Sequence, residues 1–208
     1  MNSSRYITLA FAPALAAALV LVAGCFNEPE PAYKTVEPEQ RVYLSDKGLK
    51  DLSGCAEALA AGESIDYLNL DRNELEVLPQ EIPALKGLKW LRLNSNRLSA
   101  LPDLSALVSL RRIYLQGNNF ESVPETLKDL PELTDIDLSN NPLKEVPEWL
   151  AAKEGLENLS FSRTEITALP ADLKAWRSLH SLQLGDLNLS AKEMARIRAA
   201  LRKTAIVF

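Results

Sequence analysis

Histidine, cysteine and glycine are scarce in this chain of 208 residues, which contains one histidine, two cysteines and eight glycines. No motif pairs a serine or cysteine nucleophile with the single histidine, His180, so we expect it to be a surface residue. No glycine-rich phosphate-binding loop is present. Asp135 and Asp137 share one face of a predicted strand, but without histidine or cysteine beside them they are better explained as solvated residues than as metal ligands or paired acids. The composition therefore favours a protein that is not an enzyme and needs no cofactor or metal.

Basic residues are outnumbered by acidic residues, 23 to 28, which gives a net charge of −5. If residues 1–24 are removed, Arg5 leaves with them, and the remaining 184 residues hold 22 basic and 28 acidic side chains, a net charge of −6. A chain of this charge is not drawn to nucleic acid or to an anionic membrane surface. We therefore expect no nucleic-acid partner, and any attachment to a membrane has to come from a lipid.

One pattern of 22 to 23 residues occurs five times between Ile65 and Ser178, and a partial sixth copy starts at Leu179. In the second copy its positions are Leu88, Leu91, Leu93, Asn96, Leu98, Leu101 and Pro102. The apolar fourth and sixth positions alternate with polar ones, which predicts a short strand with one buried face and one solvated face. The Leu-Pro step cannot continue a ladder, so the chain has to turn back in a looser form. Since one coil cannot bury its own leucines, the coils are expected to stack around a shared core.

This pattern, L-x-x-L-x-L-x-x-N-x-L-x-x-L-P, resembles the leucine-rich repeat family and extends from about Arg41 to the C-terminus. The resemblance implies an α/β leucine-rich repeat solenoid: a curved, parallel sheet on the concave face, an irregular or short-helical convex face, and a cap at each end. The ninth position corresponds to the asparagine ladder of that family, whose amides satisfy buried backbone groups where the strands end. It is occupied by Asn73, Asn96, Asn118 and Asn141. Thr164 and Leu187 replace asparagine in the last two coils, so we expect the ladder to weaken there.

The chain divides into five predicted segments. They are a lipoprotein signal peptide (1–24), a lipidated cysteine with a tether rich in proline and glutamate (25–40), an N-terminal cap (41–64), the repeats (65–189) and a C-terminal helix–strand cap (190–208). Within the first cap, residues 55–61 predict a short helix. In the second, Ser190 and Glu193 form a capping-box sequence that opens a helix through about Lys203. Residues 205–208 predict a last strand that closes the core.

The N-terminus is typical of an exported protein. Arg5 precedes an apolar run over residues 6–22, which has the form of a secretory signal peptide. The following V-A-G-C sequence resembles a bacterial lipobox, and the resemblance implies cleavage after Gly24 and a lipid on Cys25. An uncleaved membrane anchor is the alternative, although the run is shorter than the roughly 20 residues that a spanning helix prefers. Phe26 stands where an aspartate would retain a lipoprotein at the inner membrane, so in a double-membraned bacterium the outer membrane is favoured.

Lipidation of Cys25 leaves Cys55 without a partner for an internal disulfide. We then expect Cys55 to be a buried and unreactive thiol. A bridge between Cys25 and Cys55 is the alternative, and the extended tether between them speaks against it.

The outward positions of the predicted strands gather aromatic and basic side chains. Repeat phase brings together Tyr67, Trp90, Arg92, Arg112 and Tyr114 in the first three coils, next to Asp135 and Asp137 in the fourth. Aromatic residues and arginine are enriched at binding hot spots, and folding does not require them at such positions. The alternative is a structural role, in which both arginines stack on Trp90 and Tyr114 and pair with the two aspartates. Trp149 and Trp176 are expected on the convex side, where they would fill the core.

These observations predict a non-enzymatic, monomeric module that is anchored to the bacterial cell envelope by a lipid and binds a protein or peptide through its concave face. Two alternatives stay open. A structural envelope lipoprotein would use the tether and assembly contacts, and the patch would be incidental. A module for glycan or peptidoglycan would use the aromatic side chains to stack on sugar rings.

Overall fold

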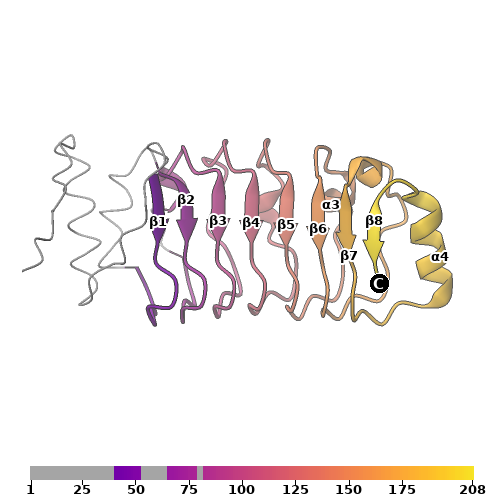
Figure 1. Cartoon of the computed structure of the whole chain (residues 1–208), viewed down its shortest axis with the longest axis horizontal. Coiled ribbons are helices and arrows are strands. Elements are labelled where there is room, and N and C mark those ends of the chain that lie inside the picture. Colours follow the sequence, from indigo (N-terminus) through magenta and orange to yellow (C-terminus); the bar gives the residue numbers. More distant parts are fainter. Residues whose placement is uncertain (1–39, 53–64, 79–81) are drawn as a thin grey trace, which may run out of the picture.

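The computed structural model describes residues 40–52, 65–78 and 82–208. In this part of the chain, eight strands form one parallel sheet in which each strand pairs only with its neighbours in sequence (Figure 1). The strands are β1 (Gln40–Tyr43), β2 (Ile65–Asn69), β3 (Trp90–Arg92), β4 (Arg112–Tyr114), β5 (Asp135–Asp137), β6 (Asn158–Ser160), β7 (Ser181–Gln183) and β8 (Ala205–Val207). The predicted solenoid with a parallel sheet is confirmed.

Several predicted features lie outside the described residues. They are the signal peptide, Cys25 and its tether, the short helix at 55–61 and the state of Cys55. Within the described ranges, no helix has the length and apolar character needed to cross a lipid bilayer.

The described parts of the return segments are irregular or form short helices, in agreement with the turns expected at Pro102, Pro124, Pro147 and Pro170. These helices are η1 (Ile82–Ala84), η2 (Glu125–Leu127), α3 (Glu148–Ala152) and η3 (Ala175–Ser178). Pro124 and Pro147 stand directly before η2 and α3, as their N-cap residues. Proline fixes φ and donates no hydrogen bond, so it ends the extended segment and suits the first turn of a helix.

The fourth and sixth repeat positions point between the sheet and the return segments, and their side chains are buried. They are Leu68, Leu70, Leu91, Leu93, Ile113, Leu115, Ile136, Leu138, Leu159, Phe161, Leu182 and Leu184. They belong to one continuous hydrophobic cluster that extends from Leu44 to Leu201. Trp176 is fully buried on the return side, where its ring stacks on Phe161 at 6.3 Å and its indole nitrogen donates to the Leu150 carbonyl at 2.9 Å. Trp149 packs against the same cluster and is half-buried.

Buried asparagines connect successive coils where the strands end. The Asn118 amide nitrogen donates to the carbonyls of Leu93 and Leu115, both at 2.9 Å, and its oxygen accepts from the Leu98 amide at 3.0 Å. The same arrangement, with donation to two coils and acceptance from the preceding coil, is found at Asn73, Asn96 and Asn141. Thr164 donates instead to the Phe161 carbonyl of its own coil. A hydroxyl therefore does not reproduce the link between coils.

A helix and a strand close the C-terminal end. Helix α4 (Ala191–Ala200) covers the end of the sheet next to β8 in Figure 1. Ser190 accepts from the Glu193 amide at 3.1 Å, as an N-cap residue does. The helix ends three residues before the predicted limit at Lys203, because the chain must turn to enter β8.

The Glu193 side chain ties α4 to the fifth coil. One carboxylate oxygen accepts from the Leu169 amide at 2.9 Å and from Arg196 at 2.7 Å, and Arg196 in turn donates to the Leu169 carbonyl at 2.9 Å. The Arg196 hydrogen bonds and that of the Leu169 amide together hold the pKa of Glu193 below its ordinary value. The charged carboxylate of Glu193 therefore stabilises the cap more than the protonated carboxyl group does.

Replacing Glu193 with glutamine is expected to reduce the pH dependence of stability. A carboxyl group with a lowered pKa in the folded state adds stability above its unfolded pKa, about 4.5, and loses it as the pH falls through the folded value. Glu193→Gln should therefore be less stable than wild type at pH 7, by about 1 kcal/mol, and the gap should close towards pH 3. Urea unfolding at pH 7, 5, 4 and 3 measures this, and a gap that stays constant with pH would contradict the assignment.

Candidate functional site

One face of the sheet presents two rows of side chains that cross all eight strands. Register places Arg41, Tyr67, Trp90, Arg112, Asp135, Asn158, Ser181 and Ala205 in the first row. It places Tyr43, Asn69, Arg92, Tyr114, Asp137, Ser160, Gln183 and Val207 in the second. Neighbouring members of a row are separated by one strand spacing, about 4.8 Å.

The rows differ in chemistry along the sheet. Over β1 to β4 they carry four aromatic residues and three arginines, which we call the aromatic–arginine patch: Arg41, Tyr43, Tyr67, Trp90, Arg92, Arg112 and Tyr114. Over β5 to β7 they carry Asp135 and Asp137, followed by serine, asparagine and glutamine. The five aromatic and arginine residues predicted from the sequence thus lie together on one sheet face.

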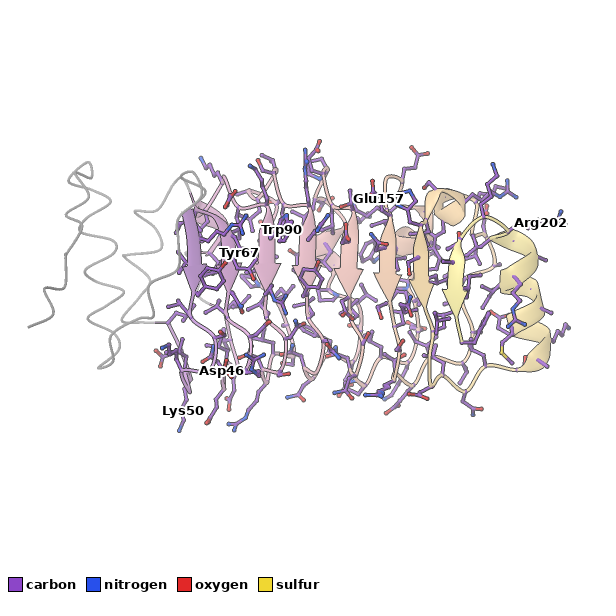
Figure 2. All side chains as sticks on the ribbon, in the orientation of Figure 1. Asp46, Lys50, Tyr67, Trp90, Glu157 and Arg202 are labelled. Carbon is purple, nitrogen blue, oxygen red and sulfur yellow. The ribbon has the colours of Figure 1, made fainter. Side chains whose placement is uncertain are left out.

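Three aromatic rings form a continuous surface over the first three strands. The ring centroids of Tyr43 and Tyr67 are 5.2 Å apart, and those of Tyr67 and Trp90 are 5.9 Å apart, with tilted planes in both pairs. Figure 2 shows Tyr67 and Trp90 on neighbouring strands of the sheet face. Tyr43 is 43% exposed and Trp90 is 36% exposed. Burial raises the pKa of Tyr67, so its hydroxyl stays protonated and can donate a hydrogen bond at neutral pH.

Arg92 pairs with a residue that the sequence did not suggest. Its Nε donates to a carboxylate oxygen of Asp71 at 2.7 Å, and Asp71 is only 2% exposed. The structural alternative considered from the sequence includes a pair of Arg92 with Asp137, and this pair does not form because Arg92 lies on β3 and Asp137 on β5, with Tyr114 between them. The guanidinium does stack on Tyr114, with its carbon 5.3 Å from the ring centroid. Burial alone would lower the pKa of Arg92, but the hydrogen bond to Asp71 raises it, and the group stays charged.

Arg112 is held in place without using its hydrogen-bond donors. Its guanidinium carbon lies 4.4 Å from the centroid of the Trp90 ring, and its Nε is 3.7 Å from a carboxylate oxygen of Asp135. That separation is too long for a hydrogen bond. The side chain is 39% exposed, and none of the hydrogen bonds recorded among the described residues involves it. Arg112 thus stacks on Trp90 and pairs with Asp135, while its guanidinium donors make no hydrogen bond to the described residues.

The two aspartates of the fourth coil differ from each other. Asp135 is only 9% exposed and accepts from the Thr134 hydroxyl at 2.6 Å and from the Asn158 amide at 2.9 Å. The expectation that it is a solvated residue is therefore wrong, because two neighbouring donors satisfy it in place of water. Asp137 accepts from the amide and the hydroxyl of Ser139, at 2.9 and 2.6 Å. Neither aspartate is poised for acid–base chemistry by a nearby histidine.

Sequence reasoning missed three residues of this surface. Arg41 and Tyr43 were assigned to the N-terminal cap, whereas their strand β1 pairs with β2 and continues both rows. The sequence does contain a signal for this strand, because the apolar Val42 and Leu44 alternate with the outward Arg41 and Tyr43. Asp71 follows the buried Leu70 at the end of β2, and the sequence alone gave no reason to pair it with Arg92.

The remaining candidate positions were searched for metal or nucleophile clusters in the part of the chain that the structure describes. His180 is exposed, with its Nδ1 3.9 Å from a Glu157 carboxylate oxygen. No group of three histidine, cysteine or acidic side chains that could hold a metal ion was found among the described residues. A depression of about 310 Å³ between α3 and η3 has a described lining of alanine, glutamate, aspartate and lysine, with no histidine, serine or cysteine among the described lining residues.

Comparison with protein families agrees with this architecture. Residues 63–120 match a family described as "Leucine rich repeat", and residues 108–151 match one described as "Leucine Rich repeats (2 copies)". Residues 63–151 therefore match leucine-rich repeat families. Leucine-rich repeat solenoids commonly use extended surfaces of this kind to bind proteins.

A solved structure of a leucine-rich repeat protein from Leptospira interrogans is similar to the chain, with 22% sequence identity and a TM-score of 0.47. The aligned part covers 81% of this chain and 60% of that one, so the chain spans about three-fifths of the length of the Leptospira protein. A comparison with curated proteins found no match.

Proposed function

We propose that this leucine-rich repeat protein is a non-enzymatic recognition module that binds a protein or peptide through the aromatic–arginine patch. The observation that carries the proposal is Arg112, which is 39% exposed and fixed against Trp90 without a hydrogen bond to the described residues. The sheet does not need this arrangement, because β6 and β7 fill the equivalent positions with Asn158, Ser160 and Ser181. Aromatic residues and arginine are the types that dominate binding energy at protein interfaces.

Two physical features favour tight binding at this patch. A guanidinium presents five donors in a planar fork, which suits carboxylates and backbone carbonyls of a partner. Because Trp90 and Asp135 already hold the Arg112 side chain, binding loses less of its rotamer entropy. Beside it, the rings of Tyr43, Tyr67 and Trp90 offer apolar surface.

We further propose that a lipid on Cys25 anchors the module to the bacterial cell envelope, on the outer membrane. The sequence of residues 1–25 supports this proposal, and the acidic net charge leaves a lipid as the means of attachment. The chain should incorporate a palmitate analogue in a bacterial host, Cys25→Ser should abolish labelling, and the matched change Cys55→Ser should leave it intact. Equal labelling of all three chains would contradict lipidation at Cys25.

Removal of either of the two central side chains of the patch should weaken partner capture. The tagged full chain, extracted from envelope membranes in detergent, is compared with Trp90→Ala and Arg112→Ala, and co-purifying proteins are quantified by mass spectrometry. Each change should weaken binding by 2 kcal/mol or more, about 30-fold. Thermal stability should change little, because both side chains are more than a third exposed.

Arg163→Ala is the matched control, since Arg163 is 69% exposed and lies outside the two sheet rows. It should leave capture unchanged. A partner captured equally by all four chains would contradict binding at the patch and favour a structural envelope role. Loss of binding to purified peptidoglycan, without loss of any protein, would instead assign the patch to a glycan.

A further inference from the structure

A segment of this same chain has the chemistry that the aromatic–arginine patch fits. Residues 28–39, E-P-E-P-A-Y-K-T-V-E-P-E, hold four glutamates, three prolines and one lysine. They lie outside the described residues and end immediately before β1, the first strand of the patch. We propose that residues 28–39 dock on the aromatic–arginine patch of their own chain and that a partner must displace them.

The charges of the two elements are complementary. The segment has four glutamates and one lysine, a net charge of −3, whereas the patch holds three arginines. Arg92 is already paired with the buried Asp71, so it adds little free positive charge. Arg112 is also paired, with Asp135 at 3.7 Å, but its guanidinium makes no hydrogen bond to the described residues, so it is the position where a glutamate of the segment gains most.

The prolines of the segment match the aromatic surface. Proline-rich chain is extended before it binds, so it loses little entropy when it docks on an aromatic-lined surface. The rings of Tyr43, Tyr67 and Trp90 are 5.2 and 5.9 Å apart and offer such a surface across three strands. Tyr43 and Trp90 are exposed enough to be covered.

The geometry allows the segment to reach the whole patch and limits it to this part of the sheet. From β1 to β4 there are three strand spacings, about 14 Å, whereas twelve extended residues span about 37 Å. Beyond β4 the rows present Asp135 and Asp137 and no basic residue before β8. These aspartates would repel the glutamates, so docking ends at β4.

Docking would regulate partner binding. This regulatory role rests on the proposed function of the patch. A segment joined directly to β1 has an effective concentration in the millimolar range, so only a partner that binds well displaces it. With the lipid on Cys25, a docked tether holds the domain close to the bilayer. Displacement would release a tether that reaches up to about 45 Å.

Photo-crosslinking in the full chain tests docking directly. A benzophenone amino acid is incorporated at position 67 in the cell envelope, where an aromatic ring replaces an aromatic ring, and adducts are identified by mass spectrometry. The expected product is a crosslink within one chain to a peptide from residues 28–39. The same amino acid at position 183, in the second row on β7, should give no such product. Combined Glu28→Lys, Glu30→Lys, Glu37→Lys and Glu39→Lys should lower the yield at position 67 at least tenfold.

Each other outcome overturns docking within the chain. An adduct with the mass of two chains would assign the segment to a second copy. An adduct with another protein alone, or no adduct at position 67 in a chain with wild-type thermal stability, would show that the segment does not occupy the patch. The capture experiment with Trp90→Ala and Arg112→Ala measures partner binding without reference to residues 28–39. The proposed function can therefore be confirmed even if the crosslinking experiment contradicts docking.

Discussion

Replacing Asn118 with alanine is expected to lower the free energy of unfolding by about 3 kcal/mol or more. The change removes two donors and one acceptor and leaves the carbonyls of Leu93 and Leu115 and the amide of Leu98 without these partners. Asn118 is only 5% exposed, so water does not readily take its place. A buried backbone group that loses its hydrogen bond costs about 1–3 kcal/mol. Urea unfolding followed by circular dichroism measures the loss.

Thr164→Ala provides the matched control at the same repeat position. Thr164 is 9% exposed and makes one hydrogen bond, to the Phe161 carbonyl of its own coil, so its loss should cost only about 1 kcal/mol. Equal losses for Asn118→Ala and Thr164→Ala would show that the hydrogen bonds between coils add nothing beyond those within a coil. The ladder would then be a consequence of the fold and not one of its supports.

Repeat phase explains why so much of the sheet could be predicted from the sequence. A fixed period places equivalent residues side by side, so counting alone aligns Trp90 with Arg112 and Arg92 with Tyr114. The same reasoning extends to stacking, since a guanidinium and a ring one strand apart are within reach. Features that repeat with the coil are therefore accessible to sequence reasoning.

Features that depend on a single coil were not accessible in this way. The pair between Arg92 and Asp71 forms because the Arg92 side chain reaches the carboxylate that follows β2. The burial of Asp135 depends on its hydrogen bonds with Thr134 and Asn158. Neither pattern recurs elsewhere in the repeats, so the period carries no signal for them.

The turn after each strand shows the same limit. The residue before the ninth position has a positive φ in every described coil, and only Gly117 is a glycine. The others are Asp46, Arg72, Ser95, Asn140, Arg163 and Asp186. Glycine is the usual sequence signal for a positive φ. Here the hydrogen bonds of the neighbouring coils impose the conformation on other residues, so local sequence does not reveal it.

Replacing Leu115 with alanine is expected to cost about 2–5 kcal/mol, because a fully buried side chain is lost and a cavity remains between coils. Leu115 follows β4, directly after Tyr114, and the β4 coil has neighbours on both sides. The control is Ile206→Ala in β8, which pairs only with β7 and is half-buried, so about 1–2 kcal/mol is expected there. Thermal and urea unfolding measure both, and equal losses would contradict a core shared between neighbouring coils.

Leu115→Ala and Trp90→Ala test the patch in different ways. The first removes core packing next to the patch, and the second removes one of its binding side chains. Leu115→Ala removes packing next to Tyr114, so partner capture and stability should fall together as the coil of β4 loosens. Trp90→Ala should weaken capture about 30-fold while stability stays near that of wild type. If Leu115→Ala retained full capture despite losing several kcal/mol of stability, binding would not require an ordered β4. The partner would then have to be recognised without Arg112 and Tyr114, which the proposed site does not allow.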